Sequence, residues 1–161
     1  MSNQYEQIAT RVLREVEEQL GHNVNIEYWK SNRPYSGRAY CKTFTVKVPH
    51  PVSDISLNTY IHELGHLIHQ VKPSCLNEYK ACIFALEKMK ENGIKVSRKV
   101  KQHHNWYIAY SLCQALNRNL KTIPPELKPF KKYITTRKQH SINGHGDTWI
   151  TERYYADISK C

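Results

Sequence analysis

The chain has 161 residues, of which 40% are hydrophobic, 11% aromatic and 24% charged, and its formal net charge is +10. This length predicts a single domain, residues 1–161, and the composition is typical of a folded globular protein rather than a disordered one. No apolar run approaches the roughly 18 residues of a membrane-spanning helix, so no membrane contact is expected. The N-terminal segment is polar and lacks the apolar core of a signal peptide, which predicts an intracellular, cytoplasmic protein. The five cysteines include no CxxC pair, which argues against a disulfide framework.

The first third of the chain predicts one helix followed by two strands. Apolar residues recur at helical spacing from Asn3 to Leu20, and Gly21 is suited to end that helix. Alternating residues predict a strand over Val24–Trp29 and another over Ala39–Val48, separated by turn residues at 33–37. We expect these two strands to pair with each other.

Three further helices are expected after the strands. The first begins near Ser53–Ser56 and runs to about Val71, the second spans Ser74–Glu91, and the third spans about Ser97–Asn119. Three prolines in Thr122–Pro129 predict a loop.

An HExxH sequence at residues 62–66 lies within the first of these helices. His62 and His66 are four residues apart, so their imidazoles project from the same helix face and can bind one zinc ion. Glu63 lies beside that face, where its carboxylate can accept a proton from a zinc-bound water. The flanking residues are apolar, so the helix is expected to be buried, where unpartnered polar groups are costly. The motif therefore predicts a catalytic zinc site; the alternative is a helix with surface histidines.

A catalytic zinc needs a third protein ligand and an open fourth position. We expect Glu78 to supply the ligand, because it lies early in the next helix, just after the turn marked by Pro73. The small Ala81, one turn later, would allow close packing of the two helices. The alternative for Glu78 is an exposed carboxylate favoured by the helix dipole. His69 and His145 are the rival ligands, and we favour a place in the wall of the site for His69.

The C-terminal tail carries candidates for stabilising the oxyanion that peptide hydrolysis generates. His145 lies between two glycines, which would let its turn approach the metal closely. Tyr154 or Tyr155 could donate a hydrogen bond in the same way. The alternative for His145 is a histidine in a surface loop.

Positive charge is concentrated in one segment, Lys88–Lys138, which holds 13 Lys/Arg and 2 Asp/Glu. Such a segment is either a solvated face or a surface for nucleic acid or an acidic protein. No helix-turn-helix or RNA-binding signature accompanies it, so any nucleic-acid contact is expected to be non-specific and strongly salt-dependent. His103 and His104 lie in this segment, and we expect them to be solvated. The candidate anion-binding residues are Lys99, Lys101, Arg118, Lys121, Lys131 and Lys132.

Two zincin families resemble parts of this sequence. The HExxH motif, with Glu78 in the next helix, resembles gluzincin metallopeptidases, and the segment NEYKACIFAL at residues 77–86 is similar to ImmA/IrrE-like peptidases, small intracellular enzymes often found with phage or mobile elements. The segment from Trp29 through Ser36-Gly37-Arg38-Ala39 is similar to SprT-like proteases, as is His145-Gly146 followed by an aromatic residue. SprT-like proteins act on proteins crosslinked to DNA.

Both resemblances imply the same fold and activity. The fold would be α+β, zincin-like, with a small antiparallel sheet packed on the HExxH helix and further helices after it. The strand at Thr43–Val48 would be the edge that borders the cleft, where an extended substrate pairs. The activity would be zinc-dependent hydrolysis of a protein or peptide, with one zinc held by His62, His66 and Glu78. The alternative is a zinc-containing module that binds DNA or protein on the same scaffold.

Overall fold

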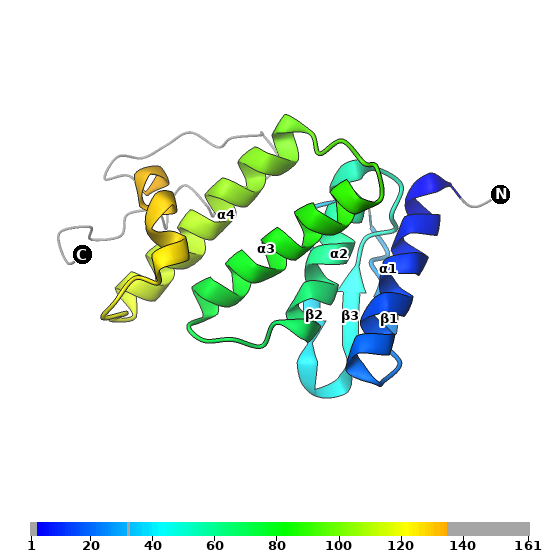
Figure 1. The fold of residues 1–161 in the computed structure, drawn as a ribbon, viewed down its shortest axis with the longest axis horizontal. Coiled ribbons are helices and arrows are strands. Elements are labelled where there is room, and N and C mark those ends of the chain that lie inside the picture. The colour runs from blue at the N-terminus through cyan, green and yellow to red at the C-terminus, as the bar shows by residue number, and fades with distance from the viewer. Residues whose placement is uncertain (1–2, 32, 135–161) are drawn as a thin grey trace. The chain divides into compact units, whose positions relative to one another are not determined.

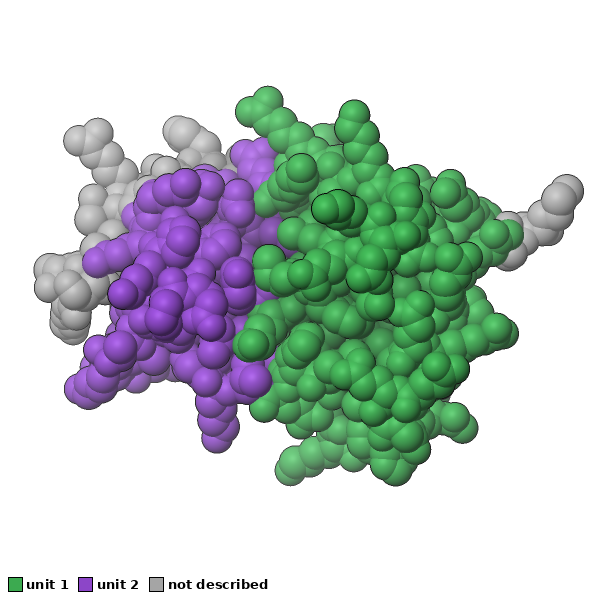
Figure 2. Space-filling view, viewed as in Figure 1, with its two compact units in different colours: residues 1–70, 80–101 green, residues 71–79, 102–161 purple. Residues whose placement is uncertain are grey.

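The computed structural model describes residues 3–31 and 33–134 and has the expected mixture of helices and strands, an α+β fold (Figure 1). Contacts divide the described chain into two compact units (Figure 2). The first unit contains residues 3–70 and 80–101, and the second contains residues 71–79 and 102–134. No helix among the described residues is long and apolar enough to cross a membrane. The elements, in chain order, are α1 (Gln4–Leu20), β1 (Asn25–Tyr28), β2 (Arg38–Tyr40), the 3-10 helix η1 (Cys41–Thr43), β3 (Thr45–Val48), α2 (Asp54–Ile68), α3 (Ser74–Glu91), α4 (Arg98–Asn117) and the 3-10 helix η2 (Pro125–Tyr133).

Helix α1 confirms the first predicted helix, and both of its ends have identifiable causes. The Asn3 side chain accepts a hydrogen bond from the Glu6 backbone, and the Glu6 side chain accepts one from the Asn3 backbone, a reciprocal pair that caps the first turn. Gly21 ends the helix with φ 68°, a left-handed conformation that glycine adopts without steric cost. The buried face carries Ile8, Ala9, Val12 and Val16.

The sheet has three strands in the order β1-β3-β2, which corrects two expectations. β1 pairs with β3 in parallel and β2 pairs with β3 antiparallel, so the sheet is mixed rather than antiparallel. Thr43–Val48 was expected to be an edge strand, but β3 is the central strand and the edges are β1 and β2. The expected edge position is therefore wrong.

The predicted single strand Ala39–Val48 is wrong because the chain turns back within it. Residues 41–43 form the 3-10 helix η1, and Phe44 has φ 46°, in the left-handed region that few non-glycine residues occupy. These residues reverse the chain, so β2 and β3 pair with each other, with Ala39 opposite Val46 and Tyr40 opposite Thr45. The central strand then has a partner on both sides.

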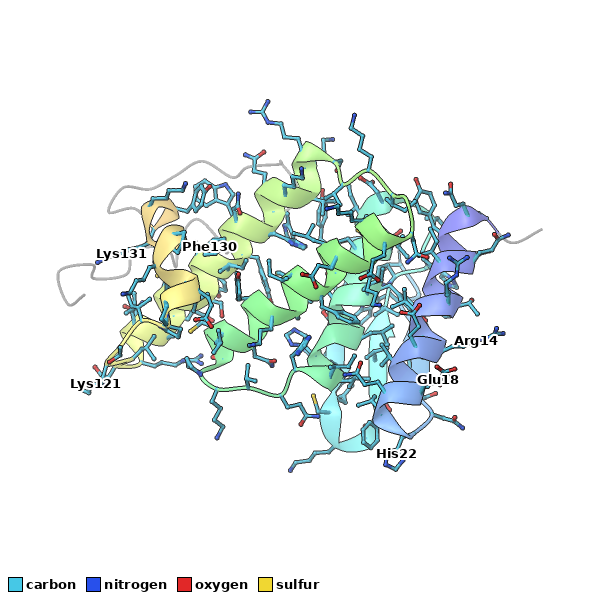
Figure 3. All side chains as sticks on the ribbon, viewed as in Figure 1. Arg14, Glu18, His22, Lys121, Phe130 and Lys131 are labelled. Atoms are coloured by element: carbon cyan, nitrogen blue, oxygen red, sulfur yellow. The ribbon has the colours of Figure 1, made fainter. Side chains whose placement is uncertain are left out.

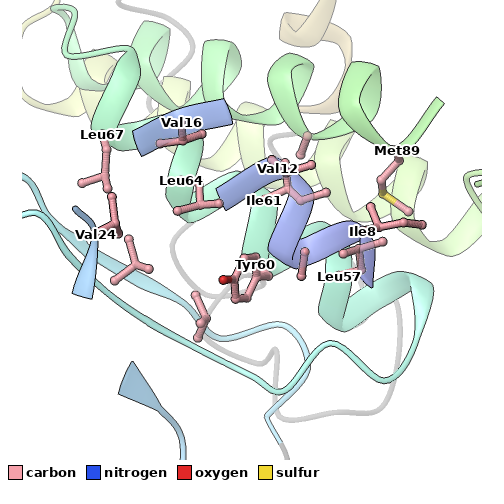
Figure 4. Close-up of a cluster of buried hydrophobic side chains, with 14 residues drawn as sticks. Ile8, Val12, Val16, Val24, Leu57, Tyr60, Ile61, Leu64, Leu67 and Met89 are labelled. Carbon is pink, nitrogen blue, oxygen red and sulfur yellow. The ribbon is translucent and has the colours of Figure 1, made fainter. Parts of the chain in front are cut away.

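The hydrophobic core of the first unit lies between the helices and one face of the sheet (Figure 4). Val46 and Val48 of β3 are fully buried, whereas Thr45 and Lys47 between them are partly exposed. This alternation gives the sheet one core face and one outer face. The other buried members come from α1, α2, α3 and the segment before β1: Ile8, Ala9, Val12, Val16, Val24, Leu57, Tyr60, Ile61, Leu64, Leu67, Ala85 and Met89.

Helix α2 is buried over most of its length and packs tightly on α3. Ser53 caps its first turn, as expected, and the helix ends at Ile68, three residues before the predicted end. A Cβ at Gly65 would lie 3.1 Å from the Ala81 Cα and 3.1 Å from the Phe84 ring, so only glycine fits without rearrangement. The close helix packing expected at Ala81 is thus confirmed, with Gly65 as its partner on α2, and α3 has the predicted bounds.

In the second unit, α4 is accompanied by an element that was predicted to be a loop. η2 begins within the predicted loop Thr122–Pro129, because Pro125 has the φ that a first helical turn needs. The Asn105 side chain donates to the Tyr133 hydroxyl at 3.3 Å, which joins α4 to the end of η2. His104 is buried, with 4% of its surface exposed, so the expectation that it is solvated is wrong.

Candidate metal centre

The HExxH residues lie together on the buried helix α2. His62, Glu63 and His66 are 8%, 7% and 9% exposed, and their ligand atoms all lie within 4.8 Å of one another. The Nε2 atoms of His62 and His66 are 3.1 Å apart, and their rings are nearly perpendicular, at 89°. The expected convergence of the two imidazoles is therefore present in this part of the chain.

The separation of the two nitrogens fits a shared metal ion. Two imidazole nitrogens bound tetrahedrally to zinc at ~2.0–2.1 Å lie about 3.3 Å apart. The observed 3.1 Å is close to that value. A hydrogen bond between two neutral imidazoles would give a similar distance, so the chemistry of the set decides between them. Two buried histidines with a buried carboxylate form a donor set suited to zinc.

Gly37 lies directly against the Glu63 side chain. A Cβ built at Gly37 would overlap the Cγ, Cδ and Oε1 atoms of Glu63. Only a residue without a side chain lets the segment before β2 approach this carboxylate so closely. Gly37 therefore leaves room for the Glu63 carboxylate that any other residue here would displace.

The loop that carries Gly37 is tied to both the sheet and α2. The Trp29 indole N–H donates to the Ser36 carbonyl at 2.7 Å, and the Thr59 hydroxyl of α2 donates to the Pro34 carbonyl at 2.6 Å. The Ser36 N–H donates to the Arg33 carbonyl at 3.0 Å, closing the turn. These bonds hold Gly37 in place from two sides.

Two thiols lie close to the histidines. Cys82 of α3 is buried, and its Sγ is 3.6 Å from the His62 Nδ1. If His62 binds a metal through Nε2, its Nδ1 carries the proton and can donate to this sulfur, which fixes the ring. Cys41 donates to the His66 carbonyl at 3.5 Å. Burial, with the nearby Glu63 carboxylate adding to the effect, raises the pKa of the Cys41 thiol, which keeps it protonated.

The rival ligand His69 lies at the end of α2, where it caps the helix. Its ring meets the Phe84 ring edge to face, with centroids 5.8 Å apart, and it is not in the group formed by the HExxH side chains. Burial, and then the Lys80 charge, lower the pKa of His69. These contacts favour the expected place in the wall rather than a ligand role.

Glu78, the expected third ligand, lies in the first turns of α3, in the part assigned to the second compact unit. It precedes Cys82 by four residues, so the two side chains share one face of the helix. Its role as a ligand stays a prediction. The other tail candidates, His145, Tyr154 and Tyr155, lie outside the described residues, and their roles also stay predictions.

Sequence reasoning missed the contact between Gly37 and Glu63 and the one between Cys82 and His62. Gly37 and Cys82 both lie in segments that were matched to a family, but the match predicted no contact for either residue. Comparison with known proteins adds nothing to this assignment, because no protein-family model, curated protein or solved structure matches the chain.

Proposed function

We propose that this chain is a zinc-dependent peptidase whose metal is held by His62 and His66, with Glu78 as the third ligand. The observation that carries the proposal is the 3.1 Å separation of the two imidazole Nε2 atoms beside the buried Glu63 carboxylate. A zinc with only a structural role would not need this carboxylate beside its ligands. Two metal-binding histidines with a carboxylate base beside them therefore favour a catalytic zinc over a purely structural one.

When bound, zinc would polarise the peptide carbonyl and make water acidic enough to attack at neutral pH. Glu63 is the general base that takes the proton from the attacking water and later gives it to the leaving amine. Gly37 leaves the space that this carboxylate occupies, and Cys82 orients the His62 ring. His145 or Tyr154 would donate to the oxyanion. The first test is elemental analysis of the purified chain, which should contain about one zinc; no zinc after reconstitution would contradict the proposal.

Replacement of Gly37 by alanine tests the positioning of Glu63. Gly37 has no left-handed φ, so alanine suits its backbone, but the added methyl group overlaps the Glu63 carboxylate. A displacement on this scale is expected to lower kcat about ten- to hundredfold while zinc content is retained. The measurement is peptide hydrolysis beside zinc content and a thermal melt.

The matched control for Gly37→Ala is Ser36→Ala, because Ser36 bonds Trp29 through its carbonyl, which the substitution keeps. This control should keep normal activity. If Gly37→Ala hydrolyses peptides as fast as the natural chain, the contact between Gly37 and Glu63 does not position the base.

A second candidate function, contact with nucleic acid, rests on cations in the second unit. Arg118, Lys121 and Lys128 are exposed and make no ion pair with any residue in the described ranges, whereas Lys88 is paired with Glu15 and Glu91. Lys121 and Lys131 are labelled in Figure 3. Unpaired, exposed cations are the feature that phosphate contact requires.

A salt titration of duplex DNA binding tests this second function. The logarithm of the affinity should fall linearly with the logarithm of the salt concentration, and Lys121→Glu and Lys128→Glu should each reduce the slope by about one. Arg14→Glu, on α1, serves as the control and should leave the slope unchanged. Binding without a salt slope would exclude phosphate contacts.

A further inference from the structure

The outer face of the sheet, opposite the core, carries an excess of positive charge. Residues 24–50 contain five Lys/Arg and a single acidic residue, Glu27. The strand register places Arg38 of β2 and Glu27 of β1 on either side of Lys47 of β3. Arg38 is exposed and Lys47 is partly exposed, as the alternation of the strands requires for the face opposite the core. This face therefore presents charge to its surroundings.

Two cations lie over the Trp29 indole ring. The Lys47 Nζ lies 4.5 Å from the centre of the indole ring, and the Arg33 guanidinium lies 5.8 Å from it. Neither cation makes an ion pair within the described ranges. The two cations thus lie over an aromatic ring, and the one carboxylate of this face, Glu27, is outnumbered by Arg33, Arg38 and Lys47.

The same ring links the cations to the site. Its N–H donates to the Ser36 carbonyl, and the next residue, Gly37, lies against Glu63. Arg38 follows Gly37 directly as the first residue of β2. Because β2 is an edge strand, a polypeptide that passes the β2 edge beside Glu63 would continue onto this face.

We propose that this cationic sheet face, defined by Arg33 and Lys47 over Trp29 and by Arg38 opposite Lys47, binds an acidic polypeptide segment of the substrate. The proposal rests on the proposed peptidase function, since the polypeptide is the class of molecule that the adjoining site would hydrolyse. Single-stranded nucleic acid is less well suited, because it stacks its bases on open aromatic faces, and this indole is already contacted by two cations. Charge complementarity would select carboxylates in a substrate segment that flanks the bond to be cleaved.

The test measures binding separately from hydrolysis. A labelled peptide of alternating glutamate and alanine is titrated by fluorescence anisotropy into the full chain carrying Glu63→Gln, so that the probe is not cleaved. The comparison probe has glutamine in place of every glutamate. The acidic probe should bind more tightly, and adding Arg38→Glu or Lys47→Glu should weaken its binding roughly fivefold or more.

The control for these charge reversals is Arg14→Glu, an exposed arginine of α1, which packs on the core side of the sheet (Figure 3). It changes the net charge equally and should leave the affinity unchanged. Arg38→Gln and Lys47→Gln remove the charge without adding repulsion, so they should weaken binding less than the reversals. Thermal melts check that each variant is folded.

Equal affinity for the two peptides, or equal weakening by Arg14→Glu and Arg38→Glu, would overturn the proposal. Tighter binding of single-stranded DNA, lost in Arg38→Glu, would also overturn it and assign the face to nucleic acid. Hydrolysis without any preference for acidic peptides leaves the peptidase proposal standing and refutes this one. If the natural chain binds the acidic peptide selectively but hydrolyses no peptide, the cationic sheet face is supported as a binding surface and the peptidase proposal is refuted.

Discussion

Glu63→Gln should retain zinc and lose peptide hydrolysis by about a hundredfold to ten-thousandfold. Glutamine has nearly the same shape as glutamate but cannot accept a proton at neutral pH. Glu63 lies beside His62 and His66. With Glu78 as the proposed third ligand, Glu63 is not needed to hold the metal, so the zinc should remain. Steady-state hydrolysis of a peptide pool, with zinc measured in the same samples, gives both quantities.

Glu87→Gln provides the matched control for this substitution. Glu87 is an exposed glutamate on α3, so the same chemical change is made away from the HExxH group. Its hydrolysis and zinc content should both be unchanged. If Glu63→Gln hydrolyses peptides as fast as the natural chain, Glu63 is not the base, and a binding module with a structural metal becomes the better interpretation.

The helices and the HExxH pair were predictable because their causes are local. Ser53 caps α2 and Gly21 ends α1 through contacts within a few residues. The convergence of His62 and His66 follows from the period of the helix alone. Such features need no knowledge of the rest of the chain.

The sheet was predicted less well because its arrangement depends on distant partners. The alternation over Ala39–Val48 indicates extended chain but does not reveal the reversal at Phe44. Which strand is central depends on β1 pairing with β3 rather than with β2, which follows β1 in the sequence. Sequence spacing carries no information about that choice.

The contacts around the site also depend on tertiary structure. Residues 33–37 were predicted to be a turn, and the turn closes at residues 33–36, just before Gly37. The sequence did not reveal that Gly37 lies against Glu63, in a loop that Thr59 of α2 bonds at Pro34. The contact between Cys82 and His62 depends on how closely α3 packs at Gly65. A small residue predicts that something approaches closely, but not which side chain it meets.

Glu78→Ala should lose most of its bound zinc, because two imidazoles alone form an incomplete site. Glu78 lies one helical turn before Cys82, whose sulfur is 3.6 Å from the His62 Nδ1, and the two side chains share one face of α3. The natural chain should carry about one zinc by elemental analysis. It should also melt at a higher temperature when zinc is added, since a metal at a hundredfold its Kd stabilises the fold by about 2.7 kcal/mol. The variant should show neither the full zinc content nor the full shift.

His69→Ala and His145→Ala, measured in the same way, distinguish Glu78 from its rivals. His69 lies against Phe84, so its removal should leave the zinc content near one. If Glu78→Ala keeps its zinc and His145→Ala loses it, the third ligand is in the C-terminal tail and the resemblance to SprT-like proteases becomes the better guide. If none of Glu78→Ala, His69→Ala and His145→Ala lowers the zinc content, the metal is held by His62 and His66 with a third ligand that the sequence did not suggest. If instead the natural chain binds no zinc, the 3.1 Å contact between the two imidazoles is a hydrogen bond and the peptidase proposal fails with it.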